Sequence, residues 1–258
     1  MNVLENKIII STRPFTKNDA INNYLAKKGA SVLDFPMIEI CPTKIKDSTI
    51  NCLKKINSYQ WIVFTSKNGV EYFFKLLNTL NIHSKKITAS KIAVIGKKTS
   101  EEVLKNKCKP YLISSGNTSE DLSKELSAKV KTNDKILLVL GNLAKNTLEK
   151  GFAKTVNITR IDVYKTTKPN TISKDIIERI KKDNYNIIIF TSPSGFKNFK
   201  TTMNKNKIFS DFRVACIGKT TEKEILKADC KPLLVSSKSD GENFAKEIEN
   251  FLINNIIN

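Results

Sequence analysis

The chain contains the same passage twice, and this duplication limits the possible fold more than any other feature of the sequence. Residues 91–126 align without a gap on residues 213–248 at a shift of 122, and 17 of the 36 aligned positions are identical. The identities include Gly96/Gly218, Thr99/Thr221, Cys108/Cys230, Lys109-Pro110/Lys231-Pro232 and Ser114-Ser115/Ser236-Ser237. Upstream of each copy, IVFTSKNGVEYF (62–73) matches IIFTSPSGFKNF (188–199) at a shift of 126. The chain therefore consists of two related halves, and a ligand between them would meet two similar walls.

Length and composition fit a pair of globular domains. A chain of 258 residues can form two domains of ordinary size, each with its own core. No apolar run approaches the ~20 residues of a membrane helix, and the first ten residues lack the basic-then-apolar order of a secretory signal. We expect a cytoplasmic protein without a membrane segment.

The net charge of +19 raises nucleic acid as a partner. The excess is almost all lysine, however, whereas base-reading and phosphate-clamping interfaces favour arginine for its bidentate geometry. Because no nucleic-acid-binding motif is recognisable, we expect no nucleic-acid partner. A small polyanionic substrate would be attracted by the same positive field.

The cysteines indicate neither a disulfide framework nor a zinc site. They form no CxxC pair and no Cys/His ligand spacing, so no metal is expected. We interpret them as small core residues; they are Cys41, Cys52, Cys108, Cys216 and Cys230.

Strand and helix patterns alternate along the whole chain. Six short runs are uniformly apolar, which is typical of strands buried on both faces of a parallel sheet: KIIIST (7–12), WIVFTS (61–66), KIAVIG (91–96), KILLVL (135–140), NIIIFTS (186–192) and RVACIG (213–218). Apolar residues at helical spacing lie between them. The alternation predicts an α/β fold with open, doubly wound parallel sheets.

Hydroxyl groups and glycines follow the predicted strands. In doubly wound sheets ligands bind beyond the carboxyl ends of the strands, where helix N-termini attract carboxylates or phosphates. These positions predict an anionic ligand; they are Ser11-Thr12-Arg13, Thr65-Ser66, Gly96-Lys97, Ser114-Ser115, Gly141-Asn142, Thr191-Ser192, Gly218-Lys219 and Ser236-Ser237.

Some of these residues also have a purely structural interpretation. Thr99-x-x-Glu102 and Thr221-x-x-Glu224 have the capping-box pattern, in which the threonine stabilises a helix start by ~1 kcal/mol. The glycines after the strands form neither G-x-G-x-x-G nor a P-loop, so neither an NAD nor an ATP site is indicated.

The sequence offers little catalytic machinery. Its only histidine, His83, lies in a polar stretch that is typical of a surface loop. No G-x-S-x-G elbow and no paired-carboxylate motif is present. An enzyme with this sequence would act by positioning and modest proton transfer.

Seven segments together resemble the uroporphyrinogen-III synthase family in order and spacing. No single segment is diagnostic, but the ordered set covers nearly the whole chain, and the duplication accompanies it. The segments are STRP (11–14), FTSKNGVEYF (64–73), AVIGKKT (93–99), DVYKT (162–166), FTSPSGFKNF (190–199), CIGKTT (216–221) and SSKSDGENFAKEI (236–248).

The resemblance implies a cofactor-free enzyme of tetrapyrrole (haem) biosynthesis. Such an enzyme closes hydroxymethylbilane, a linear tetrapyrrole with eight carboxylates, to uroporphyrinogen III with inversion of the last ring and loss of water. In the usual account the hydroxyl leaves to give an azafulvene, and a spiro intermediate follows. Because this substrate cyclises unaided to the uninverted isomer, the protein must hold one conformation. The family also implies a monomer and a transient hand-over from hydroxymethylbilane synthase.

The resemblance also changes the expected domain map. The duplication alone would divide the chain near residue 130, but family members build one domain from both chain ends. We therefore expect domain 1 at 1–36 plus 168–258, domain 2 at 42–163, and linker strands near 36–42 and 162–169. Each linker ends at a proline. Two flavodoxin-like or Rossmann-like domains on thin linkers would hinge about a cleft.

Site residues follow from the family positions. Tyr164 is the candidate catalytic residue, because a phenol with a pKa near ~10 stays protonated at neutral pH and can assist departure of the hydroxyl. Packing at the linker is the alternative role of its ring. The candidate substrate-binding residues are Arg13, Ser66, Thr99, Ser192, Gly218, Lys219 and Thr221.

Two positions depart from the family pattern. Gly141-Asn142 stands where members often carry Arg-Gly, which removes a carboxylate contact, and Lys219 stands where many have proline, which adds one. Two other classes remain open. A non-catalytic sensor or binding protein for a tetrapyrrole or another polyanion would show no isomer selectivity, and a nucleic-acid-binding protein would lose affinity steeply with salt.

Overall fold

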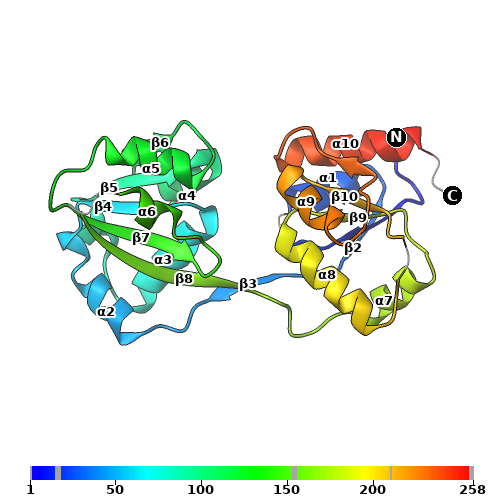
Figure 1. Cartoon of the computed structure of the whole chain (residues 1–258), viewed down its shortest axis with the longest axis horizontal. Helices are drawn as coiled ribbons and strands as arrows, with labels where there is room; N and C mark the ends of the chain where they lie inside the picture. The colour runs from blue at the N-terminus through cyan, green and yellow to red at the C-terminus, as the bar shows by residue number, and fades with distance from the viewer. Residues whose placement is uncertain (1, 15–18, 153–155, 210, 256–258) are drawn as a thin grey trace. The chain divides into compact units, whose positions relative to one another are not determined.

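The chain divides into two compact units. The computed structural model describes residues 2–14, 19–152, 156–209 and 211–255. Unit 1 comprises the described residues of Met1–Glu39 and Thr167–Asn258, and unit 2 comprises those of Ile40–Thr166. In Figure 1 unit 2 is drawn from light blue to green, whereas unit 1 combines the dark blue start with the yellow-to-red end. The domain boundaries expected above stay a prediction.

Among the described residues, unit 2 contains a six-stranded sheet with the order β3-β8-β7-β4-β5-β6. Every neighbouring pair from β8 to β6 is parallel. The strands are β3 (Glu39–Pro42), β4 (Trp61–Phe64), β5 (Lys91–Ile95), β6 (Leu112–Ser114), β7 (Lys135–Gly141) and β8 (Asn157–Thr167). The helices are α2 (Asp47–Lys54), α3 (Lys67–Thr79), α4 (Gly96–Lys105), α5 (Ser119–Ser127) and α6 (Thr147–Gly151), with 3₁₀ turns η1 (Ile56–Ser58) and η2 (Ser84–Ile87).

Unit 1, over its described residues, contains a five-stranded parallel sheet with the order β11-β10-β9-β1-β2. The strands are β1 (Ile8–Ser11), β2 (Ser31–Asp34), β9 (Ile187–Phe190), β10 (Val214–Cys216) and β11 (Leu234–Val235). The helices are α1 (Ala20–Lys27), α7 (Lys174–Lys181), α8 (Pro193–Lys205), α9 (Lys219–Leu226) and α10 (Gly241–Asn254).

The strand orders of the two units are related by a circular permutation. In unit 2 the order β6-β5-β4-β7-β8 places the strands, counted from β4, as third, second, first, fourth and fifth. Unit 1 has the order β11-β10-β9-β1-β2, which reads the same when the count starts at β9 and continues from β11 to β1. The order reverses between β4 and β7 in unit 2 and between β9 and β1 in unit 1. Because ligands of doubly wound sheets bind beyond the carboxyl ends of the strands at such a reversal, these two edges are where a site is expected.

Alternating side chains fill a core on each face of the unit 2 sheet. Ile62 and Phe64 of β4 pack in one buried cluster with Phe73 of α3. Trp61 and Val63 point to the other face, into a cluster with α5. Side chains of successive strand residues point to opposite faces, so a strand that is apolar throughout is covered on both sides. The doubly wound α/β fold predicted from the apolar runs is confirmed, and all six runs contain a strand.

The repeated Cys-Lys-Pro stretch ends a helix in each unit. After α4, Lys107 adopts φ 60, and the amide of Cys108 donates to the carbonyl of Val103 at 3.3 Å. After α9, Asp229 adopts φ 52, and the amide of Cys230 makes the matching bond at 3.4 Å. This bond belongs to a helix-terminating motif. Both cysteines are partly buried against the core of their own unit.

The capping boxes predicted at Thr99 and Thr221 are wrong. Helix α4 begins at Gly96, and α9 begins directly after Gly218, and neither start has a side-chain cap. Both threonines therefore lie within the first turns, where they are 4% and 2% exposed. Gly96 adopts φ 73, a left-handed conformation that favours glycine and lets the helix start immediately after the strand.

No helix in the described part of the chain combines the length and the apolar character needed to cross a membrane.

Candidate active site

Ser66 and Tyr164 meet at the carboxyl edge of the unit 2 sheet. Ser66 follows β4 and is the N-cap of α3, and its Oγ accepts a hydrogen bond from the amide of Gly69 at 3.0 Å. The same Oγ lies 3.1 Å from the hydroxyl oxygen of Tyr164, which comes from β8. The edge is the one at which the strand order reverses, so two of the predicted site residues lie where the topology places a ligand.

Gly141 makes room for the Tyr164 side chain. It is the last residue of β7 and stands opposite Tyr164 beyond a register shift between Leu140 and Gly141. A Cβ on Gly141 would fall 2.8 Å from the Tyr164 hydroxyl oxygen and closer still to the ring. A side chain at position 141 would therefore displace the phenol from this place.

The ring of Tyr72 supports Tyr164 from a third direction. Its centroid lies 5.9 Å from that of Tyr164 with an interplanar angle of 29°, a stacked arrangement. The Tyr72 hydroxyl donates to the backbone carbonyl of Ile40 at 2.8 Å. Helix α3 therefore supplies the ring that stacks on the phenol, and its N-cap is the serine that contacts the phenol oxygen.

A hollow of about 350 Å³ lies beside the Ser66–Tyr164 pair. Asn117, Leu143 and Lys145 also line it. Leu143 is 61% exposed although it is large and apolar. The hollow thus combines hydroxyl groups, one ammonium group and an exposed apolar side chain, a mixture suited to a ligand with apolar rings and carboxylates.

Arg160 holds the loop that carries Leu143 and Lys145. Its guanidinium donates to the carbonyl of Ala144 at 3.0 Å and to the side chain of Asn146 at 3.0 Å. It also makes ion pairs with Glu149 and Asp162 at 3.1 and 2.9 Å. Its partly buried side chain therefore holds one wall of the hollow in place, and its hydrogen bonds are used within the protein.

The neighbouring strand end binds a carboxylate of the protein itself. The amide and the hydroxyl of Ser115 both donate to Glu125, at 3.0 and 2.6 Å. Hydrogen bonds from Ser115 hold the pKa of Glu125 below its ordinary value. Unit 1 repeats the arrangement with Ser237 and Glu247. These serines, which the sequence offered as ligand positions, are thus already occupied.

The predicted serine of unit 1 lies at the corresponding strand end. Ser192 is the N-cap of α8, and its Oγ accepts from the amide of Gly195 at 3.1 Å and lies 3.3 Å from the hydroxyl of Ser194. Thr12, which follows β1, donates to the carbonyl of Ile189 at 2.7 Å. The edge at the strand reversal of unit 1 is therefore polar as well.

The cationic candidates of unit 1 are already ion-paired. Arg13 pairs with Asp19, the N-cap of α1, at 2.5 Å. Lys219 pairs with Glu222 at 3.1 Å, but its side chain is 81% exposed. An exposed pair of this kind is worth little and exchanges readily, so Lys219 can turn to a ligand more easily than Arg13.

The remaining candidates form the starts of two helices. Gly218 is buried and is approached by Ser239, because a Cβ on it would fall 2.5 Å from the Ser239 hydroxyl. Thr99 and Thr221 are buried in the first turns of α4 and α9. Thr99 shares unit 2 with Ser66 and Tyr164, whereas Gly218 and Thr221 belong to unit 1.

Neither His83 nor Cys216 is among the described residues that line the hollow beside Tyr164. His83 is exposed, and its Nδ1 accepts from the amide of Lys85 at the start of η2. Burial raises the pKa of the Cys216 thiol to about 11, so it remains protonated at neutral pH. Within the described ranges, no group of three His, Cys, Asp or Glu side chains is arranged to hold a metal ion.

Sequence reasoning missed three residues that shape this site. Tyr72 lies in a segment used for the resemblance, but its stacking on a residue 92 positions later has no local signal. The contacts of Arg160 with the loop have no local signal in the sequence, and nothing in the family pattern indicated that Gly141 makes room for the phenol. A glycine directly after an apolar strand run could have indicated close approach by another group.

Comparison with known proteins shows the family of this chain. A family model described as uroporphyrinogen-III synthase HemD matches residues 19–246. A protein of Methanocaldococcus jannaschii, named provisionally as uroporphyrinogen-III synthase, is 32% identical over 88% of this chain and 91% of its own length. Uroporphyrinogen-III synthase of Chlorobaculum parvum is 28% identical over 94% of this chain and 98% of its own.

A solved structure shares the fold. The crystal structure of a mutant uroporphyrinogen III synthase from the thermophilic bacterium Thermus thermophilus superimposes with a TM-score of 0.66 at 12% identity, over 96% of this chain and 100% of that chain. At this identity the likeness concerns the fold alone. The family match, which spans most of the sequence, carries the assignment: this chain belongs to the uroporphyrinogen-III synthase family.

Proposed function

We propose that the unit 2 site built around Tyr164 assists the ring closure that defines this family. As a family member, the chain is an enzyme of tetrapyrrole biosynthesis that cyclises hydroxymethylbilane to uroporphyrinogen III with inversion of the last ring and loss of water. The observation that supports the role of Tyr164 is its contact with Ser66 at 3.1 Å, beside a hollow at the strand reversal.

Tyr164 acts as the proton donor to the departing hydroxyl group. The Ser66 Oγ accepts from the Gly69 amide and still carries its own proton, which it can donate to the phenol oxygen. That bond stabilises negative charge on the phenol oxygen, while the phenol proton moves to the hydroxyl of the substrate. The carbon–oxygen bond then breaks, and water leaves with the bonding electrons. The adjacent pyrrole nitrogen stabilises the resulting cation as an azafulvenium ion, and return of its N–H proton to the phenolate gives the neutral azafulvene.

The substrate carboxylates bind at helix starts and to lysines. The Ser115–Glu125 contact supports this proposal, because it is a carboxylate held by an amide and a hydroxyl at a strand end of the same fold. Lys145 of unit 2 and Lys219 of unit 1 offer ammonium groups, and Arg13 would first have to exchange Asp19. Ser192 and the amides after Gly218 offer hydrogen-bond donors.

Thr99 and Thr221 act indirectly in this proposal. Each is almost fully buried in the first turn of its helix, so a contact with substrate would require the turn to open. We assign them to positioning of the amides at the starts of α4 and α9, which face the carboxyl ends of β5 and β10.

The assembly belongs to the proposal as well. We propose that the enzyme works as a monomer and receives its reactive substrate by transient hand-over from hydroxymethylbilane synthase. Sedimentation of the purified chain should give the mass of one 29.1 kDa chain. A stable dimer would contradict the first part.

Product analysis tests the activity directly. Purified protein is supplied with freshly generated hydroxymethylbilane, and the products are oxidised and separated into type I and type III isomers. We expect type III to dominate, against type I alone in the control without enzyme. Type I alone in both samples would contradict the function and favour a binding protein.

A further inference from the structure

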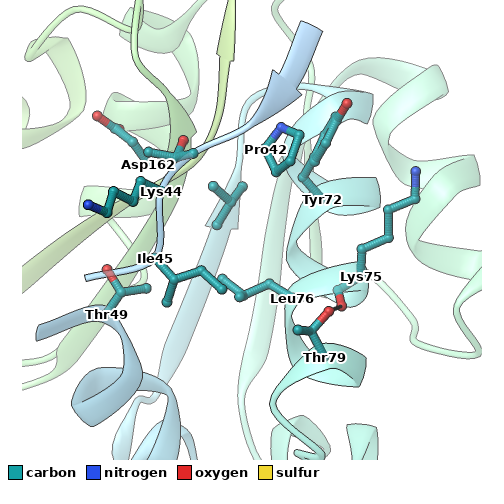
Figure 2. Close-up of a pocket in the computed structure, with 11 residues that line it drawn as sticks. Pro42, Lys44, Ile45, Thr49, Tyr72, Lys75, Leu76, Thr79 and Asp162 are labelled. Carbon is teal, nitrogen blue, oxygen red and sulfur yellow. Dashed lines mark hydrogen bonds between the residues drawn. The ribbon is translucent and has the colours of Figure 1, made fainter. Parts of the chain in front are cut away.

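A second, larger hollow lies in unit 2, and Tyr72 is part of its lining. Its volume is about 590 Å³, and all its lining residues belong to unit 2. Figure 2 shows Ile45 and Leu76 reaching toward one another across it, with Lys44 and Lys75 on opposite sides. Residues of the β3 end, α2, α3 and β8 line the hollow, and Tyr164 and Ser66 are not among its lining residues.

The duplicated position in unit 1 carries a larger side chain than the one that lines this hollow. At a shift of 128, Phe35 of unit 1 stands where unit 2 has Val163. Phe35 and the nearby Met37 are 1% and 0% exposed, and they pack in one cluster with Ile177 and Ile180 of α7. Unit 2 has the smaller Val163 at this position. Val163 is buried in one cluster with Leu53 of α2, and it also lines the hollow.

The lining defines the class of molecule that fits. Ile45, Leu76 and Val163 give an apolar floor, and Thr49 and Thr79 add hydroxyls. A volume of this size with a mostly apolar wall and a few polar groups is typical of sites for small organic ligands. The hollow fits a mostly apolar body rather than a fully charged molecule.

The charges favour one acidic group on that body. Lys75 is paired with Glu71 at 2.7 Å, and Asp162 is paired with Arg160 at 2.9 Å, so these charges compensate one another. Among the described residues Lys44 forms no ion pair, which leaves one positive charge at the rim. A single sulfonate or carboxylate on the ligand would complement it.

Tyr72 connects this hollow to the candidate active site. It lines the hollow, its hydroxyl donates to Ile40 of β3, and its ring stacks on Tyr164. The ammonium of Lys75 lies 5.1 Å from the centre of the Tyr72 ring, on which it exerts a cation–π attraction. A molecule that packs against Tyr72 therefore contacts a side chain that holds Tyr164.

We propose that the hollow between α3 and the β3 end is an effector site for a small amphipathic anion, and that its occupancy changes the catalytic rate through Tyr72 and Tyr164. The effect on rate rests on the proposed role of Tyr164, whereas binding does not. The two parts therefore need separate measurements.

Binding is tested with the fluorescent anion 8-anilinonaphthalene-1-sulfonate on the full-length protein. We expect one saturable site whose affinity falls at least tenfold in Leu76→Trp, which fills the hollow, and about fivefold in Lys44→Gln, by loss of one charge contact. Lys46→Gln, an equal charge change outside the lining, should bind as wild type does. Circular dichroism checks that each variant is folded.

Wild-type affinity in folded Leu76→Trp would overturn the site. The kcat is then measured with and without saturating probe. We expect the probe to change the kcat of the wild type at least twofold and to leave the kcat of Leu76→Trp unchanged. Tyr164→Phe is assayed in parallel without probe. If the probe leaves the kcat of the wild type unchanged while Tyr164→Phe has a strongly reduced kcat, the effector coupling is overturned and the role of Tyr164 stands. If Tyr164→Phe is also fully active, it is the proposed function that fails.

Discussion

The two units share one framework and differ where the candidate chemistry lies. Ser66 and Ser192 cap equivalent helices in the same way, each accepting the amide three residues later. At a shift of 128, however, Pro36 stands opposite Tyr164 and Arg13 opposite Gly141. Unit 1 therefore has neither the phenol nor the gap that receives it, although its strand end is built alike.

Positions that are identical in the two copies can be compared with positions that differ. Residues that are identical between the copies mostly maintain the fold, as the Cys108 and Cys230 amides do when they end α4 and α9. Position 72 differs, because Tyr72 corresponds to Asn198 at a shift of 126. Both hold a backbone carbonyl, of Ile40 and of Met37, at 2.8 Å, but only the tyrosine can stack on another ring.

The largest effect is expected from a buried side chain of unit 1, compared with a side chain that lines the larger hollow of unit 2. Met37→Ala removes a fully buried side chain, and such truncations cost about 2–5 kcal/mol. Leu76→Ala at the wall of the hollow should cost less than half as much, because its side chain is only partly buried. Urea unfolding of both variants measures the difference, and equal losses would contradict the interpretation of the hollow.

The next effect concerns Gly141. Gly141→Ala places a methyl group against the Tyr164 ring and should lower kcat/KM by about 100-fold, as a displacement of about 1 Å can. In a Tyr164→Ala background the same change should have almost no further effect. Steady-state kinetics of the single and double variants decide this, and independent, multiplying losses would show that Gly141 does not act through Tyr164.

Ser66 and Ser192 have the same capping role, so their alanine variants test whether the two units differ in function. Ser66→Ala and Ser192→Ala each remove an N-cap and should each cost about 1 kcal/mol of stability. Ser66→Ala should also lower kcat by up to about tenfold, by loss of one hydrogen bond to the phenol. Ser192→Ala should instead raise KM. A similar fall of kcat in both variants would mean that the Ser66–Tyr164 contact has no special role.

The smallest effect is expected from the two serine–glutamate contacts. The pKa values of Glu125 and Glu247 are lowered in the fold, so each contact stabilises the protein above the ordinary carboxyl value of 4.5 and loses this effect as the pH falls below it. Glu125→Gln and Glu247→Gln should therefore reduce the loss of stability on acidification. Unfolding curves between about pH 6 and pH 3 test this, and unchanged pH dependence in either variant would contradict it.

The strands that sequence patterns predicted are those with continuous apolar runs. The runs at 61–66 and 186–192 form β4 and β9, whose residues are all buried. Strands β2, β6 and β11 were missed because they are short and include partly or fully exposed residues. Each lies at an edge of its sheet, with a neighbouring strand on one side only, and its sequence lacks the continuous apolar run of a fully buried strand.

The candidate site was predictable in part. Ser66 and Tyr164 were named from the family positions, and their contact follows from strand ends that meet at one edge. The capping pattern failed at Thr99, because the positive φ of Gly96 starts the helix earlier. The ion pair of Arg13 with Asp19 and the contacts of Arg160 depend on loop geometry that spacing alone does not encode.

The most direct test of the account is the rate and isomer composition of the product formed by Tyr164→Phe. This variant keeps the ring against Gly141 and Tyr72 and removes only the hydroxyl, so it should fold normally. We predict a fall in kcat of about 100-fold or more, as expected for loss of a general acid, with a rising share of type I product from unaided closure. If Tyr164→Phe has the kcat of the wild type and forms type III alone, the proposal that the Tyr164 hydroxyl assists ring closure is contradicted.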